Sequence, residues 1–252
     1  MKKIFSLENQ TALITGGGTG IGKAIALCMS RAGADVLLTG RREEFLSLAC
    51  MEIPEKCRYI VHDVSDQEQT EKFAEMVCQR VGVPNIIVNN AGINLKKSVS
   101  KTTYEDLNEI LKVNVLGAHI LTRAFIPKFI ERGSGSILFI TSMAALFGVP
   151  DVCAYAASKS ALLGLLRTYA TELSPKGIRV NAIAPGWIET DMSKSALKND
   201  KERLDRILSR TPMHRMGKPE DVGWAAVYLC SPEASFITGQ QLIVDGGVSI
   251  GF

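Results

Sequence analysis

The stretch TALITGGGTGIG at residues 11–22 contains the pattern that decides the fold. Its first five residues form a short apolar run typical of a buried strand, and a glycine-rich turn follows at once. Helical periodicity then runs from Ile21 to Ala32 and stops at Gly33. Strand, glycine turn and helix in this order present free backbone N–H groups and a positive helix end, which suit a pyrophosphate. The usual G-x-G-x-x-G spacing is absent, and the glycines instead follow the pattern Thr15-Gly16-x-x-x-Gly20-Ile21-Gly22.

The same alternation of apolar runs and amphipathic stretches continues along the rest of the chain. Further strands are predicted at 36–39, 59–61, 85–88, 136–140, 179–183 and 241–244, and helices at 67–81 and 155–173 among others. Continuous apolar strands joined by helices are typical of a parallel sheet covered on both faces. The sequence therefore predicts an α/β fold, a single-domain, Rossmann-like doubly wound parallel sheet of about seven strands over residues 1–252. The polar segment 189–219 is predicted to be a lid over the site, although a pair of surface helices would also fit it.

Composition and charge exclude several other classes. The 252 residues carry 29 Lys+Arg against 26 Asp+Glu, and a net charge of +3 spread along the chain argues against a nucleic-acid partner. No apolar run approaches the ~20 residues that cross a membrane, and the N-terminus does not resemble a secretory signal. The six cysteines are scattered without a CxxC pair, so we expect free thiols in a reducing cytosol. No His, Asp or Glu cluster indicates a metal, and we expect a cytoplasmic protein.

The end of the second predicted strand indicates which dinucleotide binds. Where NAD is bound, an acid about twenty residues after the glycine turn contacts the ribose 2′-OH. Here Arg41 and Arg42 stand in its place, and their guanidinium groups favour the 2′-phosphate of NADP over NAD, unless they simply begin a solvated helix. Asp63, beside Val64 after the third strand, could accept from an adenine amino group or cap the next helix.

Two further features lie where a substrate would bind. Tyr155 and Lys159 are one turn apart on a predicted helix, so a lysine ammonium could lower the tyrosine pKa and make it a usable acid–base group. Ser142 follows the strand at 136–140, at the sheet edge where open α/β folds bind substrates.

Taken together, these residues resemble the short-chain dehydrogenase/reductase family from about Phe5 to the end of the chain. The resemblance rests on motifs in the family's order and spacing: Thr15-Gly16-x3-Gly20-x-Gly22, Asn89-Asn90-Ala91-Gly92, Asn114, Ser142, Tyr155-x3-Lys159 and Pro185-Gly186. It implies hydride transfer between a nicotinamide and a carbonyl or secondary alcohol, with no metal. Tyr155 would exchange the proton, Ser142 would hydrogen-bond the substrate oxygen, Lys159 would tune Tyr155 and bind the nicotinamide ribose, and Asn114 would hold a relay water.

The same resemblance implies a set of cofactor contacts. Besides Tyr155 and Lys159, the residues expected to bind NADP are Gly16, Thr19, Gly20, Ile21, Arg41, Asp63, Val64, Asn90, Ala91, Gly92, Pro185, Gly186, Ile188 and Thr190. Thr19 stands where many NADP-using members have a basic residue, so the NADP prediction depends on Arg41 and Arg42.

The family does not fix the substrate. The pocket is expected to include Asn94, Leu95, Met143, Ala144, Phe147, Val149, Trp187 and Met192. We hypothesise that Lys96 or Lys97, in the loop after the fourth strand, binds an anionic substrate group; a solvated charge pair is the alternative. Segments 185–192 and 236–247 resemble both the 3-oxoacyl-[acyl-carrier-protein] reductases and the gluconate 5-dehydrogenases. Segments 142–145 and 210–213 favour the second, so a sugar acid or polyol is the expected substrate and the carrier-protein reductase the alternative.

The family's usual assembly implies a homotetramer, and the apolar ending at 248–252 suits burial against a partner. A different class of function is also conceivable, a non-catalytic NADP sensor or scaffold. Loss of Ser142, Tyr155 or Lys159 would indicate it, and all three are present.

Overall fold

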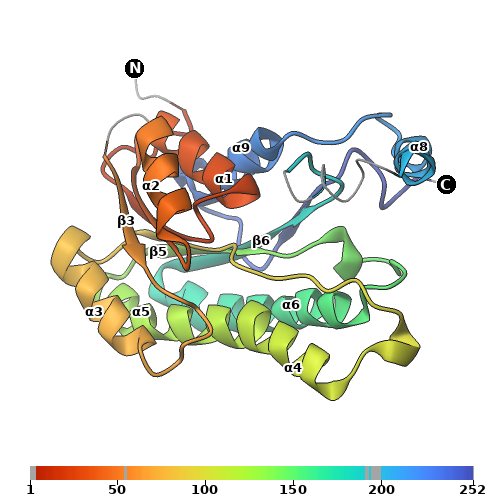
Figure 1. The fold of residues 1–252 in the computed structure, drawn as a ribbon. Helices are drawn as coiled ribbons and strands as arrows, with labels where there is room; N and C mark the ends of the chain where they lie inside the picture. The colour runs from red at the N-terminus through yellow and green to blue at the C-terminus, as the bar shows by residue number, and fades with distance from the viewer. Residues whose placement is uncertain (1–3, 54–55, 191–192, 194–199, 252) are drawn as a thin grey trace.

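The sheet of this protein has seven parallel strands in the order β3-β2-β1-β4-β5-β6-β7 (Figure 1). The computed structural model describes residues 4–53, 56–190, 193 and 200–251. The strands are β1 Thr11–Thr15, β2 Asp35–Gly40, β3 Cys57–Val61, β4 Ile86–Asn89, β5 Gly135–Ile140, β6 Ile178–Pro185 and β7 Gln241–Val244. The order reverses direction between β1 and β4, and such a switch point opens a crevice at the carboxyl ends of the strands. The predicted fold class is confirmed.

Helices cover both faces of the sheet, as Figure 1 shows. The helices are α1 Gly20–Arg31, α2 Glu43–Glu52, α3 Thr70–Val81, α4 Tyr104–Leu111, α5 Ala118–Arg132, α6 Cys153–Leu173, α8 Lys201–Arg210 and α9 Pro219–Cys230. Ile25 of α1, Leu46 of α2 and Val222 of α9 belong to the core on one face. Phe73 of α3 and Phe125 of α5 belong to the core on the other face.

A π-helical segment, Lys112–Gly117, joins α4 and α5 into one run over Tyr104–Arg132. By length and composition alone, this run is the one helix among the described residues that could cross a membrane. Its apolar side chains pack inside the protein: Leu121, Phe125 and Phe129 are buried in the core on one face of the sheet. The apolar character therefore fits a helix packed in the core of a globular domain.

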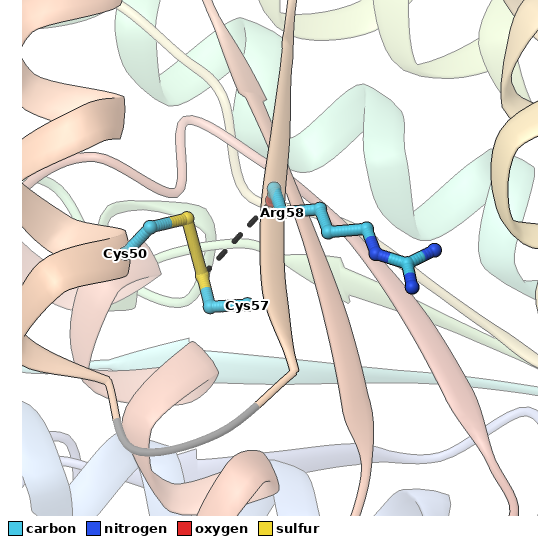
Figure 2. The surroundings of a disulfide bond; sticks show 3 residues. All are labelled: Cys50, Cys57 and Arg58. Carbon is cyan, nitrogen blue, oxygen red and sulfur yellow. Dashed lines mark hydrogen bonds between the residues drawn. A yellow bond between two sulfur atoms is a disulfide. The ribbon is translucent and has the colours of Figure 1, made fainter.

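The cysteines correct one expectation. Figure 2 shows a disulfide between Cys50 near the end of α2 and Cys57 at the start of β3, with Arg58 beside it. The chain turns back directly after α2, which brings the two Cα atoms to 5.2 Å, within the usual disulfide range. The expectation that all cysteines are free thiols is therefore wrong. Cys28, Cys78, Cys153 and Cys230 are free.

The segment predicted to be a lid lies partly outside the described residues, at 191–192 and 194–199. The described part contains α8, which Figure 1 shows at the opposite end of the molecule from α3. A short parallel bridge between Ile188 and Gly217 ties the two ends of this segment together.

Candidate active site

A cavity of about 490 Å³ lies at the carboxyl ends of the strands. It is lined by the turn after β1, by the ends of the neighbouring strands, by α6 and by residues around α8. Every residue predicted to bind the cofactor lines it, as do Ser142, Tyr155 and Lys159. Of the residues predicted to be catalytic or to bind the cofactor, only Asn114 does not. The fold thus gathers into one cleft residues that are far apart in sequence.

The turn after β1 is shaped for close approach by another group. Gly16 and Gly20 have φ values of +63° and +54°, which side chains rarely allow. A Cβ on Gly22 would lie 2.2 Å from the Gly16 carbonyl oxygen, so the first turn of α1 can pack here only with glycine. The first turn of α1 contains no acid, and its positive end faces the cleft uncompensated. These features fit a pyrophosphate.

Asn90 holds this turn against the end of β4. Its Nδ2 donates to the carbonyl oxygens of Thr15 at 2.8 Å and Gly16 at 3.2 Å. The Thr15 hydroxyl accepts from the backbone N–H groups of Asn90 and Ala91. The turn and the Asn-Asn-Ala-Gly segment therefore form one rigid unit, and this explains the position of both motifs at the same wall of the cleft.

Arg41 lies at the far end of the cleft, beyond the glycine turn. Its Nη1 is 4.0 Å from Asp63 Oδ2, and both side chains are partly exposed. Arg42 lies over the Phe45 ring at 4.2 Å, and both also line the cleft, although sequence reasoning had not placed Phe45 there. Two guanidinium groups beside one carboxylate leave this end positive, as a phosphate site requires.

The Asp63 carboxylate is engaged in a turn after β3. Its Oδ1 accepts from the backbone N–H and the hydroxyl of Ser65, at 2.9 and 2.8 Å. Burial would raise the pKa of Asp63, but these hydrogen bonds and the charge of Arg41 outweigh it and hold that pKa below its ordinary value. Because the residue that caps α3 is Gln69, the helix-capping alternative is wrong. Asp63 instead shapes a turn at the cleft.

Ser142 and Tyr155 meet at the other end of the cleft. Ser142 lies two residues beyond the end of β5, and its hydroxyl accepts a hydrogen bond from the Ala144 N–H at 3.1 Å. Tyr155 is in the first turn of α6 and is hydrogen-bonded to Ser142. Burial raises the pKa of Tyr155 above its ordinary value, and the Ser142 hydrogen bond acts in the opposite direction.

Lys159 lies one turn further along α6 and is almost fully buried. Its Nζ donates to the Ile140 carbonyl oxygen at 2.8 Å, and burial lowers the pKa of Lys159 to about 8. The Nζ is 5.6 Å from the centroid of the Tyr155 ring. Burial of the phenol raises the pKa of Tyr155 and the Lys159 ammonium is bonded to the Ile140 carbonyl of β5, so the expectation that Lys159 lowers the pKa of Tyr155 stays a prediction.

Asn114 lies behind the cleft wall, within the π-helical segment. Its Oδ1 accepts from the Ile93 N–H at 2.8 Å, and its Nδ2 donates to the Ile93 carbonyl at 2.9 Å and to Ser158 Oγ at 3.0 Å. A Cβ on Gly92 would lie 3.1 Å from Asn114 Oδ1 and 3.4 Å from Lys159 Nζ. The Asn114 and Lys159 side chains therefore both lie close to Gly92, on the side where a Cβ would stand.

The expected substrate pocket is borne out in part. Asn94, Met143, Ala144, Val149 and Trp187 line the cavity. Leu95 and Phe147 do not line it, and Met192 lies outside the described residues.

The hypothesis that Lys96 or Lys97 binds an anion is not supported by their positions. Lys97 is paired with Asp106, which also caps α4, and Lys96 is an exposed side chain outside the cleft lining. The cationic side chain that does line the cavity near Trp187 is Arg203 of α8. Sequence reasoning had no signal for it, since it lies in the polar segment whose path across the site depends on tertiary structure.

Comparisons with known proteins give consistent results. A family model described as Enoyl-(Acyl carrier protein) reductase matches residues 16–249. The chain is 37% identical over 247 residues to the 3-oxoacyl-[acyl-carrier-protein] reductase of Thermotoga maritima, covering 97% of this chain and 99% of that one. It is 36% identical to dehydrogenase/reductase SDR family member 4 of Sus scrofa, covering 96% and 88%.

Among solved structures, the fold is similar to that of a gluconate 5-dehydrogenase from Burkholderia cenocepacia in complex with NADP and tartrate. The TM-score is 0.93, at 32% identity and 98% coverage of both chains.

Proposed function

The chain belongs to the short-chain dehydrogenase/reductase family, oxidoreductases that act on alcohol and ketone groups, and on this premise we propose an NADP-dependent reaction on a sugar acid or polyol. One observation carries the proposal: Ser142, Tyr155 and Lys159 line one end of a cleft whose other end has the glycine turn and Arg41. A hydroxyl pair beside a buried ammonium suits proton exchange with a carbonyl oxygen. A positive phosphate site suits the dinucleotide.

The residues at the glycine turn fit the cofactor on their own geometry, because the cradle between Gly16, Gly20 and Gly22 would be filled by any side chain. Arg41, with Arg42 beside it, would hold the 2′-phosphate. Asp63, Val64, Asn90, Ala91 and Gly92 would border the adenosine half, and Pro185, Gly186, Ile188 and Thr190 the nicotinamide half. When bound, the cofactor supplies or accepts the hydride.

Tyr155 is the proposed acid–base group. With a raised pKa it is a neutral phenol at pH 7, so it can donate a proton to a ketone oxygen. Ser142 would donate a second hydrogen bond to the same oxygen as charge develops there. Lys159 and Asn114, which both lie close to Gly92, would return the proton to Tyr155 through bound water, and Lys159 would also bind the nicotinamide ribose.

The substrate class is inferred from a structural likeness and from one cation that lines the cleft. A sugar acid or polyol is favoured by the likeness to the Burkholderia gluconate 5-dehydrogenase and by Arg203, a cation among largely apolar residues that line the cleft near Trp187. The likeness to the Thermotoga 3-oxoacyl-[acyl-carrier-protein] reductase keeps that activity as the second candidate. A non-catalytic NADP sensor is disfavoured because the proton-transfer groups are present and gathered.

Assembly and location are part of the same proposal. We expect a homotetramer in the cytoplasm, acting as one domain with 189–219 as the substrate lid. Sedimentation of the purified protein tests the assembly, and a monomeric mass would contradict it.

The test is an absorbance assay at 340 nm. Purified protein is offered NADPH or NADH with 5-ketogluconate, an acetoacetyl thioester or a neutral diketone, and Tyr155→Phe serves as the control. We expect NADPH oxidation with 5-ketogluconate that disappears in the variant. Turnover of the thioester alone would select the second candidate, and tight NADPH binding without turnover would favour the sensor.

A further inference from the structure

The substrate end of the cleft has an unbalanced positive charge. Among the described residues that line the cavity, Asp63 is the only acid, and it lies at the other end beside Arg41. Near Trp187 the lining instead includes Arg203. A cleft lined by charge of one sign attracts ligands of the other sign.

Two features of α8 fix the position of Arg203: the cap at the start of the helix and a buried residue one turn later. Its backbone N–H donates to Asp200 Oδ1 at 3.0 Å, which fixes the start of α8. Ile207, one turn later on the same face, is buried at 6% exposure and anchors that face to the body of the protein. The Arg203 guanidinium carbon lies 5.9 Å from the centroid of the Trp187 ring, within cation–π range.

The guanidinium group has no ion-pair partner among the residues that the structure describes. On the same helix Arg206 is paired with Glu202 at 2.8 Å, and both are exposed. Arg206 is therefore neutralised at the surface, whereas Arg203 lines the cleft. A planar guanidinium fixed over an aromatic ring matches a carboxylate in bidentate geometry.

We propose that Arg203 forms the subsite for the carboxylate of an anionic substrate, with Trp187 as the platform that orients it. This inference rests on the proposed function and narrows it, because neither a neutral diketone nor the acetoacetyl chain of a thioester has a carboxylate for this subsite. Arg203 binds the non-reacting end of the substrate while Tyr155 and Ser142 hold the reacting oxygen.

A pyrophosphate of the cofactor would offer a guanidinium the same anionic chemistry. Thr190 approaches the glycine turn, because a Cβ on Gly20 would lie 3.5 Å from its Cγ2, and Thr190 and Arg203 both line the cleft. The two anions can be separated by measuring cofactor affinity and substrate affinity in the same variants.

The experiment measures binding, so that it does not depend on turnover. D-gluconate and D-glucitol, which differ by a carboxylate against a CH₂OH group, are titrated calorimetrically into NADP⁺-saturated protein. A Tyr155→Phe background prevents reaction. The variants are Arg203→Met, Arg203→Lys and, as the matched control on the same helix, Arg206→Met.

We expect the parent protein to bind D-gluconate more tightly than D-glucitol. Arg203→Met should weaken D-gluconate binding about 10-fold to 100-fold, as expected for loss of a charge-assisted hydrogen bond, and leave D-glucitol binding unchanged. Arg203→Lys should retain part of the affinity, and Arg206→Met all of it.

Three results would overturn the inference. These are equal affinity of the parent protein for the two ligands, an equal loss for both in Arg203→Met, or a weaker affinity for NADP⁺ in that variant. Failure of the proposed function is a separate result: Arg203-dependent binding of D-gluconate without reduction of 5-ketogluconate would retain the subsite and reject that substrate.

Discussion

Replacing Lys159 by methionine is expected to stabilise the apoprotein at neutral pH while removing its activity. Burial lowers the pKa of Lys159 from 10.5 to about 8, which corresponds to a penalty of about 3 kcal/mol for folding at pH 7. Methionine fills similar space without a charge. It leaves the Ile140 carbonyl without its 2.8 Å donor, a loss of about 1–3 kcal/mol. The variant should therefore be at least as stable as the wild type at pH 7, by up to about 2 kcal/mol.

The pH dependence gives the sharper test. Between about pH 8 and 10.5 the unfolded lysine binds a proton that the folded one does not, so wild-type stability rises with pH in this window. Below pH 8 both states are protonated and the penalty is constant. The advantage of Lys159→Met should therefore fall by about 2 kcal/mol between pH 7 and pH 9.5.

The measurement is urea unfolding followed by circular dichroism, without cofactor and at one fixed protomer concentration. Lys176→Met, at an exposed lysine, is the control and should show no such trend. A difference between wild type and Lys159→Met that stays constant from pH 7 to 9.5 would refute the reasoning.

Three further predictions concern the cofactor end and the disulfide. Arg41→Ala should weaken NADPH binding about 10-fold or more and leave NADH binding unchanged, as measured by fluorescence titration; equal effects would remove Arg41 from 2′-phosphate recognition. Gly22→Ala places a Cβ 2.2 Å from the Gly16 carbonyl, so it should destabilise the fold by about 1–3 kcal/mol and abolish NADPH binding, whereas Gly164→Ala, in open space, should do neither. Cys50→Ser should lower the free energy of unfolding by about 2 kcal/mol, the chain-entropy value for so short a loop. A reducing agent should lower the Tm of the wild type but not of this variant. Labelling of all six wild-type cysteines by iodoacetamide under non-reducing, denaturing conditions would show that the disulfide does not form.

The order of elements could be predicted from the sequence because each strand is a short apolar run and each helix is amphipathic. The first strand was expected at 11–15 and is Thr11–Thr15; the last was expected at 241–244 and is Gln241–Val244. Helix ends were less well predicted: α3 begins at Thr70 rather than at residue 67, because a turn shaped by Asp63 and Asp66 comes first. Right-handed crossovers limit the possible sheet orders, but the observed order β3-β2-β1-β4-β5-β6-β7 is not part of the prediction.

The sequence predicts those site residues that belong to a motif of fixed spacing. It does not predict those that only tertiary packing brings to the site. The glycine turn and the Tyr155–Lys159 pair have fixed spacing, and the cleft contains both. The pairing of Cys50 with Cys57 depends on how the chain turns back after α2, and the engagement of Lys97 depends on the position of Asp106. Arg203 lines the cleft only because the chain beyond β6 brings α8 back to it, which no local pattern encodes.

The two cations near the substrate should act on different kinetic constants. Lys159 is 4% exposed, so its charge is held in place at a cost of about 3 kcal/mol, a sizeable share of the 5–15 kcal/mol that stabilises a typical domain. Such a cost is consistent with a role in the chemical step, where a desolvated charge interacts strongly. Arg203 is only partly buried and lies at the non-reacting end of the pocket, so its interaction is made equally in the ground state and in the transition state. Substitution of Lys159 should therefore mainly lower kcat, and substitution of Arg203 should mainly raise KM for an anionic substrate.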